Sequence, residues 1–353
     1  MLNSIVNNLN NNVNENKNRL NKKTLDRKSE NIFNVEGRYL EQENFNEEID
    51  KAKEQLKYQN NNLNIYHPTD NENSNSLKEN AIVNENNYAK NSNNVRVLTE
   101  EISLIQNSDD KNNSSSDSLH DFFYEVKNSI VVGKNDYLDT LKDLFSSYMN
   151  YVNEVREALS SLSECVKAGS KDGYVEFNLA KFYAKVEGIN VKYGNNTSTI
   201  LMDFKVYFYK QIDNKYRREI HNNSIDYTED EARNVVSAIK KLFNEIKGIS
   251  INDWDMDGYD VYLVIKPDIS DLTKLLDTLK NVGDVNSTSI NLLQTEFDLI
   301  KKSIDILEKR VNTNLEELSK KYSAANSNFD NFVKIVSSTM NTLLEMAKGF
   351  LRF

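Results

Sequence analysis

Apolar side chains recur at alternating steps of four and three between residues 137 and 162. The positions that follow this spacing are Tyr137, Leu141, Leu144, Tyr148, Tyr151, Val155, Ala158 and Leu162. A mean spacing of 3.5 residues is typical of the seam of a coiled coil. Phe122, Phe123, Val126 and Ile130 extend the series backwards, with Gly133 predicted to be a kink or a break between two helices. We therefore expect a first coiled-coil arm over residues 117–170, ended by Gly169 and Gly173.

The same spacing returns near the end of the sequence and continues for longer. It runs through Leu293, Phe297, Ile300, Ile304, Leu307, Val311, Asn314 and Leu318, then through Tyr322, Ala325, Phe329, Phe332 and Val336, and finally through Met340, Leu343, Ala347 and Phe350. This pattern predicts a helix over residues 286–348, about 95 Å long, within a second arm that spans 285–353. Asn314 is the polar position that would set the register. Such a helix needs a partner, and the arm at 117–170 has the matching pattern.

The region between the two arms, 171–284, has a different pattern. The stretches "GYVEFN" and "GYDVYLVIKPD" predict strands, and "TILMDFKVYFYK" fits either a strand or a short helix. One helix is predicted to begin after Thr228, where Glu231 completes a capping box, and to end at Gly248. A second helix is predicted over "DISDLTKLLDTLKNVG". The interpretation is a small mixed α/β domain inserted between the arms.

The N-terminal third is polar and rich in asparagine, and it contains only two weak apolar islands of helical spacing. One island is Phe45, Ile49, Ala52 and Leu56; the other comprises Leu77, Ile82, Val83, Val97, Leu98, Ile102 and Ile105. We expect a disordered region at 1–40, followed by a helical hairpin and linker at 41–116. The predicted fold is mainly α: a long antiparallel intramolecular coiled coil with an inserted small α/β domain and an N-terminal helical hairpin.

Composition excludes several classes of function. The net charge of −10 argues against nucleic-acid binding, which needs an excess of Lys and Arg. The longest apolar run is "VYLVI" at 261–265, too short for a direct membrane span. The single cysteine, Cys165, allows no internal disulfide and is expected to be a buried apolar residue.

Three local motifs suggest chemistry that the surrounding sequence does not support. "DWDMDGYD" at 253–260 resembles the start of a calcium loop, but Val264 stands where a bidentate Glu is required, so an acidic turn is preferred. "KVYFYKQIDNKYRR" at 205–218 mixes basic and aromatic residues and is interpreted as a basic face that meets an acidic partner. The three histidines are far apart in sequence. No catalytic motif is present, so we expect no enzyme activity, no metal and no cofactor.

The stretch "KKYSAANSNFDNFVKIVSSTMNTLLEMAKGFLRF" resembles the C-terminal signature of the needle-tip proteins of bacterial type III secretion systems, the group of IpaD, SipD and BipD. The matching residues are Lys321, Tyr322, Ser323, Ala325, Asn326, Ser327, Asp330, Asn331, Val333, Lys334, Ser337, Ser338 and Thr339, followed by Lys348, Phe350 and Leu351. The arm at 135–162, "GSKDGYVEFN" and "GYDVYLVIKPDISDLTKLL" resemble the same family more loosely and in the same order. The resemblance covers residues 117–353.

The resemblance implies a secreted virulence protein of a Gram-negative pathogen. Such proteins are made in the cytoplasm, exported, and located on the cell surface at the needle tip. They cap the needle as a small ring, expected to be a pentamer, control secretion, and scaffold the hydrophobic translocator proteins of the translocon for host-cell invasion. In the enteric branch they also bind bile salts, and the hairpin acts as a self-chaperone that masks the coiled coil. The alternative is a secreted translocator or effector of the same system without tip location.

The resemblance also implies two sets of site residues. The expected interface with the needle subunit and neighbouring copies is Tyr322, Asn326, Asp330, Asn331, Lys334, Ser337, Ser338, Lys348, Phe350 and Leu351. The expected coiled-coil seam is Tyr137, Leu141, Leu144, Tyr148, Val155, Leu162, Phe297, Ile300, Ile304, Leu307, Val311, Leu318, Phe329 and Val336. For each polar residue of the first set, a solvated helix face is the simpler interpretation.

Overall fold

The computed structural model describes residues 74–109, 117–194, 199–220, 223–254 and 259–350. Helices dominate these residues, and three small sheets accompany them. The prediction of a mainly α fold is therefore confirmed. The predicted disordered region at 1–40 and the first helix of the hairpin, with Phe45 and Leu56, lie outside the described residues.

The first arm is helical from Asp117 to Ser160 without a break. It consists of α4 (Asp117–Val132), a π-helical segment η1 (Gly133–Asp139) and α5 (Thr140–Ser160). Of the two alternatives expected at Gly133, a kink or a break, the break is wrong, because the chain widens there into a π-helix and continues. Gly133 packs closely, since a Cβ at this position would lie 3.3 Å from the Phe329 ring and the ring would have to shift by a few tenths of an ångström.

The first arm ends earlier than its spacing predicts. α5 stops at Ser160, and Leu162 is half-buried in the short 3₁₀ turn η2 (Ser161–Glu164). The hydroxyls of Ser160, Ser161 and Ser163 each donate to the carbonyl three residues earlier. Because serine hydroxyls compete in this way with regular helical bonding, the repeat ends here and Leu162 is not part of a helical seam.

The second arm is the single helix α9 (Gln294–Phe350). It begins later than the predicted residue 286 because β9 (Ile290–Leu293) pairs with β2 (Tyr174–Phe177). Asn314 is half-buried, and Leu315 takes the buried place between Val311 and Leu318. The Asn314 side chain instead hydrogen-bonds the Tyr148 hydroxyl, beside Gly248.

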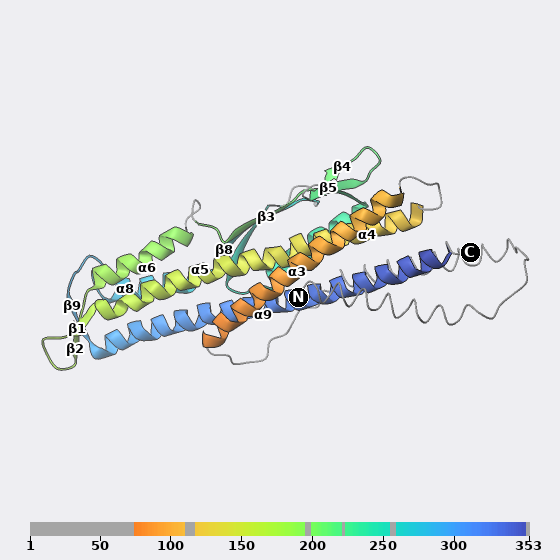
Figure 1. Ribbon diagram of the computed structural model, residues 1–353. Helices are drawn as coiled ribbons and strands as arrows, with labels where there is room; N and C mark the ends of the chain where they lie inside the picture. The colour runs from red at the N-terminus through yellow and green to blue at the C-terminus, as the bar shows by residue number, and fades with distance from the viewer. Residues whose placement is uncertain (1–73, 110–116, 195–198, 221–222, 255–258, 351–353) are drawn as a thin grey trace, which may run out of the picture. The chain divides into compact units, whose positions relative to one another are not determined.

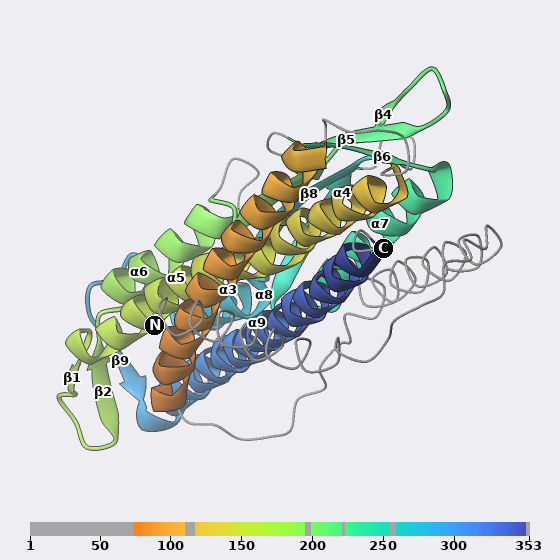
Figure 2. The ribbon, with the colours of Figure 1, turned by 45° about the vertical axis from the view of Figure 1, so that its right-hand side comes forward.

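α5 and α9 lie side by side and run in opposite directions (Figures 1 and 2). Phe145 contacts Tyr322 with ring centroids 5.7 Å apart, whereas Arg156, further along α5, donates to Asn312, nearer the start of α9. Apart from Leu162, the predicted seam positions of α5 and α9 are buried: Leu141, Leu144, Tyr148, Val155, Phe297, Ile300, Ile304, Leu307, Val311, Leu318, Phe329 and Val336. Tyr137, in η1, is half-buried. This packing forms the core between the arms.

The region between the arms is more divided than predicted. A small antiparallel sheet at the end of the arms has the order β1-β2-β9, where β1 is Val166–Ala168. The predicted strand "GYVEFN" is β2 of this sheet and does not belong to the inserted sheets. A second sheet has the order β3-β8-β7: β3 is Met202–Val206, β8 is Val261–Pro267 and β7 is Ile249–Trp254. A third has the order β4-β5-β6: Tyr209–Lys210, Tyr216–Ile220 and Asn223–Tyr227.

Three helices complete this region. The helix α6 (Leu179–Gly194) was not predicted, whereas α7 (Glu229–Asn244) and α8 (Ser270–Val282) were. The predicted capping box is present, since Thr228 Oγ1 accepts from the Glu231 amide and the Glu231 carboxylate accepts from the Thr228 amide. Residues 255–258 of the calcium-like motif lie outside the described residues.

One further helix, α3 (Ser74–Asp109), crosses the arms and packs mainly on α9, with smaller contacts to α4 (Figures 1 and 2). Its buried side differs from the predicted apolar island. Ile82 and Val83 are exposed, while the buried stripe comprises Asn84, Asn91, Val95, Leu98 and Ile102. Two asparagines therefore occupy places that a simple amphipathic helix would fill with apolar residues.

Candidate functional site

The signature stretch begins near the middle of α9 and continues to its C-terminal end, and α3 packs on its first part, at Asn326 and Asp330. Its seam residues Tyr322, Ala325, Phe329, Phe332 and Val336 are buried. Tyr322 was expected at an intermolecular interface, but it packs against Phe145 and its hydroxyl faces Glu85 of α3. Burial, followed by the nearby Glu85 carboxylate, raises the pKa of the Tyr322 hydroxyl well above its ordinary value. In this state Tyr322 is an internal packing residue.

Asn326 lies at the centre of a buried polar cluster between α3 and α9. Its exposed fraction is 1%, and Asn84 and Asn91 are equally buried. Asn91 Nδ2 donates to the Asn326 carbonyl at 2.9 Å, and Asn326 Nδ2 donates to the Asn84 carbonyl at 3.2 Å. Asn84 Nδ2 in turn donates to the Ser319 carbonyl at 3.4 Å. The contacts Asn84–Ser319 and Asn91–Asn326 each join residues 235 apart in sequence, so α3 and α9 run parallel in one fixed register.

Asp330 continues this contact at the edge of the interface. Its carboxylate pairs with Lys90 of α3 at 3.2 Å and with Lys334, one turn along α9, at 2.6 Å. Partial burial acts to raise the pKa of Asp330, but the hydrogen bonds from Lys334 and Lys90 outweigh it and lower the pKa below its ordinary value. Asp330 therefore holds α3 as an ionised carboxylate.

Four other expected interface residues follow Asp330 along α9. Asn331, Lys334 and Ser338 are exposed, and Ser337 is half-buried. With Asn341 and Glu345, the exposed residues follow steps of three and four along one side of α9. We call Asn331, Lys334, Ser338, Asn341 and Glu345 the polar strip. Lys348 and Phe350 lie in the last turns of α9, where only the backbone is described, and Leu351 is outside the described residues.

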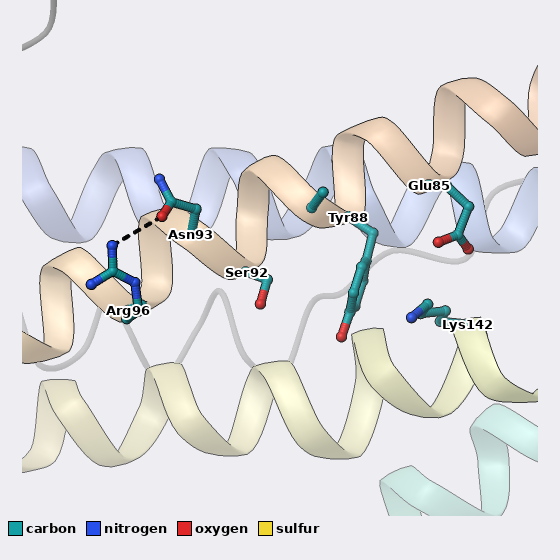
Figure 3. A pocket seen from close by; sticks show the side chains of 7 residues that line it. Glu85, Tyr88, Ser92, Asn93, Arg96 and Lys142 are labelled. Carbon is teal, nitrogen blue, oxygen red and sulfur yellow. Dashed lines mark hydrogen bonds between the residues drawn. The ribbon is translucent and has the colours of Figure 1, made fainter. Parts of the chain in front are cut away.

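A pocket of about 480 Å³ opens between α3 and α5 (Figure 3). It is lined by Glu85, Tyr88, Ala89, Ser92, Asn93, Arg96 and Lys142. The Lys142 ammonium lies 4.1 Å from the centroid of the Tyr88 ring. Arg96 is paired with Glu100 and donates to Asn93 at 3.2 Å. The pocket thus has one aromatic wall and two cationic side chains, in a place that no sequence motif marks.

Burial, together with the Asp139 carboxylate, raises the pKa of the Tyr88 hydroxyl well above its ordinary value. Tyr88 therefore remains a neutral phenol near neutral pH.

The π-helical segment η1 joins α3, α9 and the third sheet. Asp136 forms a buried ion pair with Arg218 of β5, and Tyr137 hydrogen-bonds Asn328 of α9. Arg217, the neighbouring basic residue, pairs with Asp226. The predicted basic face at 205–218 is therefore reduced, because both of its arginines are already paired within the chain.

Comparison with known families identifies the chain. Residues 41–351 match the model of a family described as type III secretion systems tip complex components. The chain belongs to this family. The resemblance drawn from the signature stretch is thus confirmed, and the match extends into the N-terminal region, where no motif had been recognised.

Curated relatives of this tip-complex protein are invasion proteins. It is 29% identical to the cell invasion protein SipD of Salmonella typhi over 140 residues, which are 39% of this chain and 40% of SipD. It is 26% identical to the invasin IpaD of Shigella flexneri over 238 residues, 67% of this chain and 61% of IpaD. The chain therefore matches between two fifths and about three fifths of these relatives' length. Neither name describes an enzyme.

A solved structure shares the fold of this tip-complex protein. It is BipD, an invasion protein associated with the type III secretion system of Burkholderia pseudomallei, with a TM-score of 0.50 and 15% identity over 78% of this chain and 83% of BipD. Within the described residues, no group of three or more His, Cys, Asp or Glu side chains is arranged to hold a metal ion. None of the helices described combines the length and the apolar character of a membrane-crossing segment.

Proposed function

We propose that this chain caps the needle of a type III secretion system as a ring, expected to be a pentamer, and that it controls secretion and scaffolds translocon assembly. Family membership supports this role. In this proposal the chain is secreted, is located at the needle tip on the bacterial surface, and contacts the needle subunit and the hydrophobic translocators. The two arms act as a supercoiled rod.

The polar strip is the observation that carries the proposal. A helix in a bundle needs polar residues on its solvent side, but folding alone does not specify which polar residues stand there. The buried members, Asn326 and Asp330, are accounted for by α3. The exposed members Asn331, Lys334 and Ser338 make no such contact with α3. We infer that they bind the needle subunit or a neighbouring copy, together with Lys348, Phe350 and Leu351.

We further propose that α3 masks part of α9 before assembly. Its contact is unusually polar, since Asn84 and Asn91 stand where apolar residues would bind more tightly. Net stabilisation by one hydrogen bond is about 1 kcal/mol, so such a contact is specific in register without being strong. A masking helix needs this combination, because it must later be released.

The pocket between α3 and α5 is the place we propose for a bile salt. A steroid acid has a rigid apolar face and an anionic tail, and it calls for an apolar wall with a cation at its rim. Tyr88 supplies the wall and Lys142 the cation, whereas the charge of Arg96 is partly offset by its pair with Glu100 and Glu85 also lines the pocket. Titration with deoxycholate should shift the NMR amide signals of residues around Tyr88, and Tyr88→Ala with Lys142→Ala should abolish that shift.

Gene replacement in the source bacterium tests the needle-tip role. Deleting the gene should make secretion unregulated and abolish host-cell invasion. A variant with Asn331→Arg and Ser338→Arg should be exported but fail to restore either property, because two large cations disrupt the polar strip. The matched control is Leu299→Arg with Ile306→Arg, which makes the same charge change at the same spacing on exposed positions of α9 and should restore both. If the deletion leaves secretion and invasion unchanged, the proposal is wrong.

A further inference from the structure

The hairpin formed by β4 and β5 carries apolar side chains that the fold leaves in solvent. The chain alternates strictly between Asp203 and Tyr209, with Phe204, Val206 and Phe208 buried and the residues between them exposed. Tyr209 of β4 is therefore 57% exposed, Tyr207, which lies between β3 and β4, is 42% exposed, and Ile212 at the turn is fully exposed. In both ribbon views the hairpin extends away from the helical arms (Figures 1 and 2).

The turn that presents Ile212 is held by its own backbone. The Gln211 amide donates to the Lys215 carbonyl at 2.7 Å, and the Asn214 amide donates to the Gln211 carbonyl at 3.1 Å. Asn214 takes the left-handed conformation, with a φ of 61°, which asparagine tolerates well. Ile212 thus lies on an ordered turn. A binding partner could cover its side chain without any refolding of the hairpin.

Charge around the tip is locally reversed in an acidic chain. The net charge of the protein is −10, whereas Lys210 and Lys215 flank the turn. The acidic residue of the turn, Asp213, accepts a hydrogen bond from the Lys215 amide and lies 4.0 Å from the Lys215 ammonium. Its charge is therefore partly offset within the turn. The exposed surface of the tip combines Ile212, two tyrosines and two lysines with Asn214 and the single carboxylate of Asp213.

We propose that this tip, Tyr207, Tyr209, Lys210, Ile212 and Lys215, binds the surface of a lipid bilayer that contains anionic headgroups. A convex tip has no groove for a peptide or a helix, but a bilayer deforms around it. Ile212 enters the boundary of the acyl chains, the tyrosine rings lie at the headgroup level, and the two ammonium groups meet lipid phosphates. This property belongs to the isolated chain and goes beyond the needle-tip role.

Vesicle flotation with the full chain tests the proposal. The probes are vesicles of phosphatidylcholine alone and of phosphatidylcholine mixed with phosphatidylserine. The wild type should float with the mixed vesicles and less with phosphatidylcholine alone, and added salt should weaken binding. Ile212→Asp should lower the vesicle partition coefficient about tenfold or more, because it removes the aliphatic group and adds an anion.

Two further variants make the result specific to the tip. Ile306→Asp, which replaces an exposed isoleucine on α9, should bind vesicles like the wild type. Ile212→Trp should keep binding, and its tryptophan emission should shift to shorter wavelength when vesicles are added.

The proposal is overturned if the wild type floats with neither vesicle, as expected if the tip instead serves an acidic protein, or if Ile212→Asp floats as well as the wild type. Failure here leaves the needle-tip proposal intact, because that proposal is tested on needles and in secretion without any lipid.

Discussion

At the scale of single residues, the asparagines of the signature stretch have two different surroundings. Asn326 is buried and bonded to α3 through Asn84 and Asn91, whereas Asn331 is exposed five residues later. The sequence showed that both match a family pattern, but it could not tell which of them is satisfied inside the chain. That distinction depends on α3, whose buried side carries asparagine where the hydrophobic pattern predicted Ile82 and Val83.

The Asn326 cluster leads to a stability prediction. Asn326→Ala keeps the backbone carbonyl that accepts from Asn91, but it removes the donor to the Asn84 carbonyl and the side-chain oxygen that lies 3.4 Å from Asn91 Nδ2. Losing these buried contacts should cost about 1–3 kcal/mol of unfolding free energy. Urea denaturation followed by circular dichroism measures this cost. Asn331→Ala is the matched control and should change the free energy by less than about 0.5 kcal/mol. Equal effects of the two substitutions would contradict the buried cluster.

The lowered pKa of Asp330 predicts a dependence on pH. The pKa of this carboxyl is lower in the folded chain than in the unfolded chain, so its stabilising effect is present above the ordinary value and is lost as the pH falls through the folded value. Asp330→Asn should therefore lower the melting temperature near about pH 6, and this effect should shrink as the pH falls through the folded pKa of Asp330. A substitution effect that persists undiminished in acid would argue against the ion pairs with Lys90 and Lys334.

At the scale of the elements, periodicity predicted the long helices well and their ends poorly. Seam residues such as Leu144 and Leu307 are buried because a 3.5-residue repeat fixes one side of a helix against its partner. The early end at Ser160 and the late start at Gln294 depend on serine hydrogen bonds and on β9 pairing with β2, which are not periodic signals. The close approach of Gly133 to Phe329 joins residues about two hundred apart in sequence, which a local pattern does not reveal.

Adjacent residues of α9 offer a sharp test of the arm packing. Leu307 is 2% exposed and Ile306 is 51% exposed, although both are aliphatic and lie in the same turn. Leu307→Ala should lower the unfolding free energy by about 2–5 kcal/mol, because it leaves a cavity between the arms. Ile306→Ala should have an effect below about 0.5 kcal/mol. Chemical denaturation of the two variants measures both values, and similar losses would mean that the assigned seam is wrong.

At the scale of the whole molecule, α3 covers part of α9, including the signature residues Asn326 and Asp330. Removing residues 1–116 should uncover the α9 surface around Asn326 and Val333, which is buried in the intact protein. We expect the shortened chain to self-associate more strongly. Size-exclusion chromatography with light scattering measures the oligomeric state of both chains. If the shortened chain has the mass of its own monomer, as the intact chain does, the result would argue against masking.

The central claim is that this protein is located at the tips of secretion needles. The most direct measurement is immunogold labelling of needles from the source bacterium with an antibody against this chain. The account predicts gold at the distal ends of needles from the intact strain and from the strain that carries Leu299→Arg with Ile306→Arg. It predicts bare tips when Asn331→Arg with Ser338→Arg replaces the wild type. Needle tips without gold in the intact strain, or tips still decorated by the polar-strip variant, would contradict it.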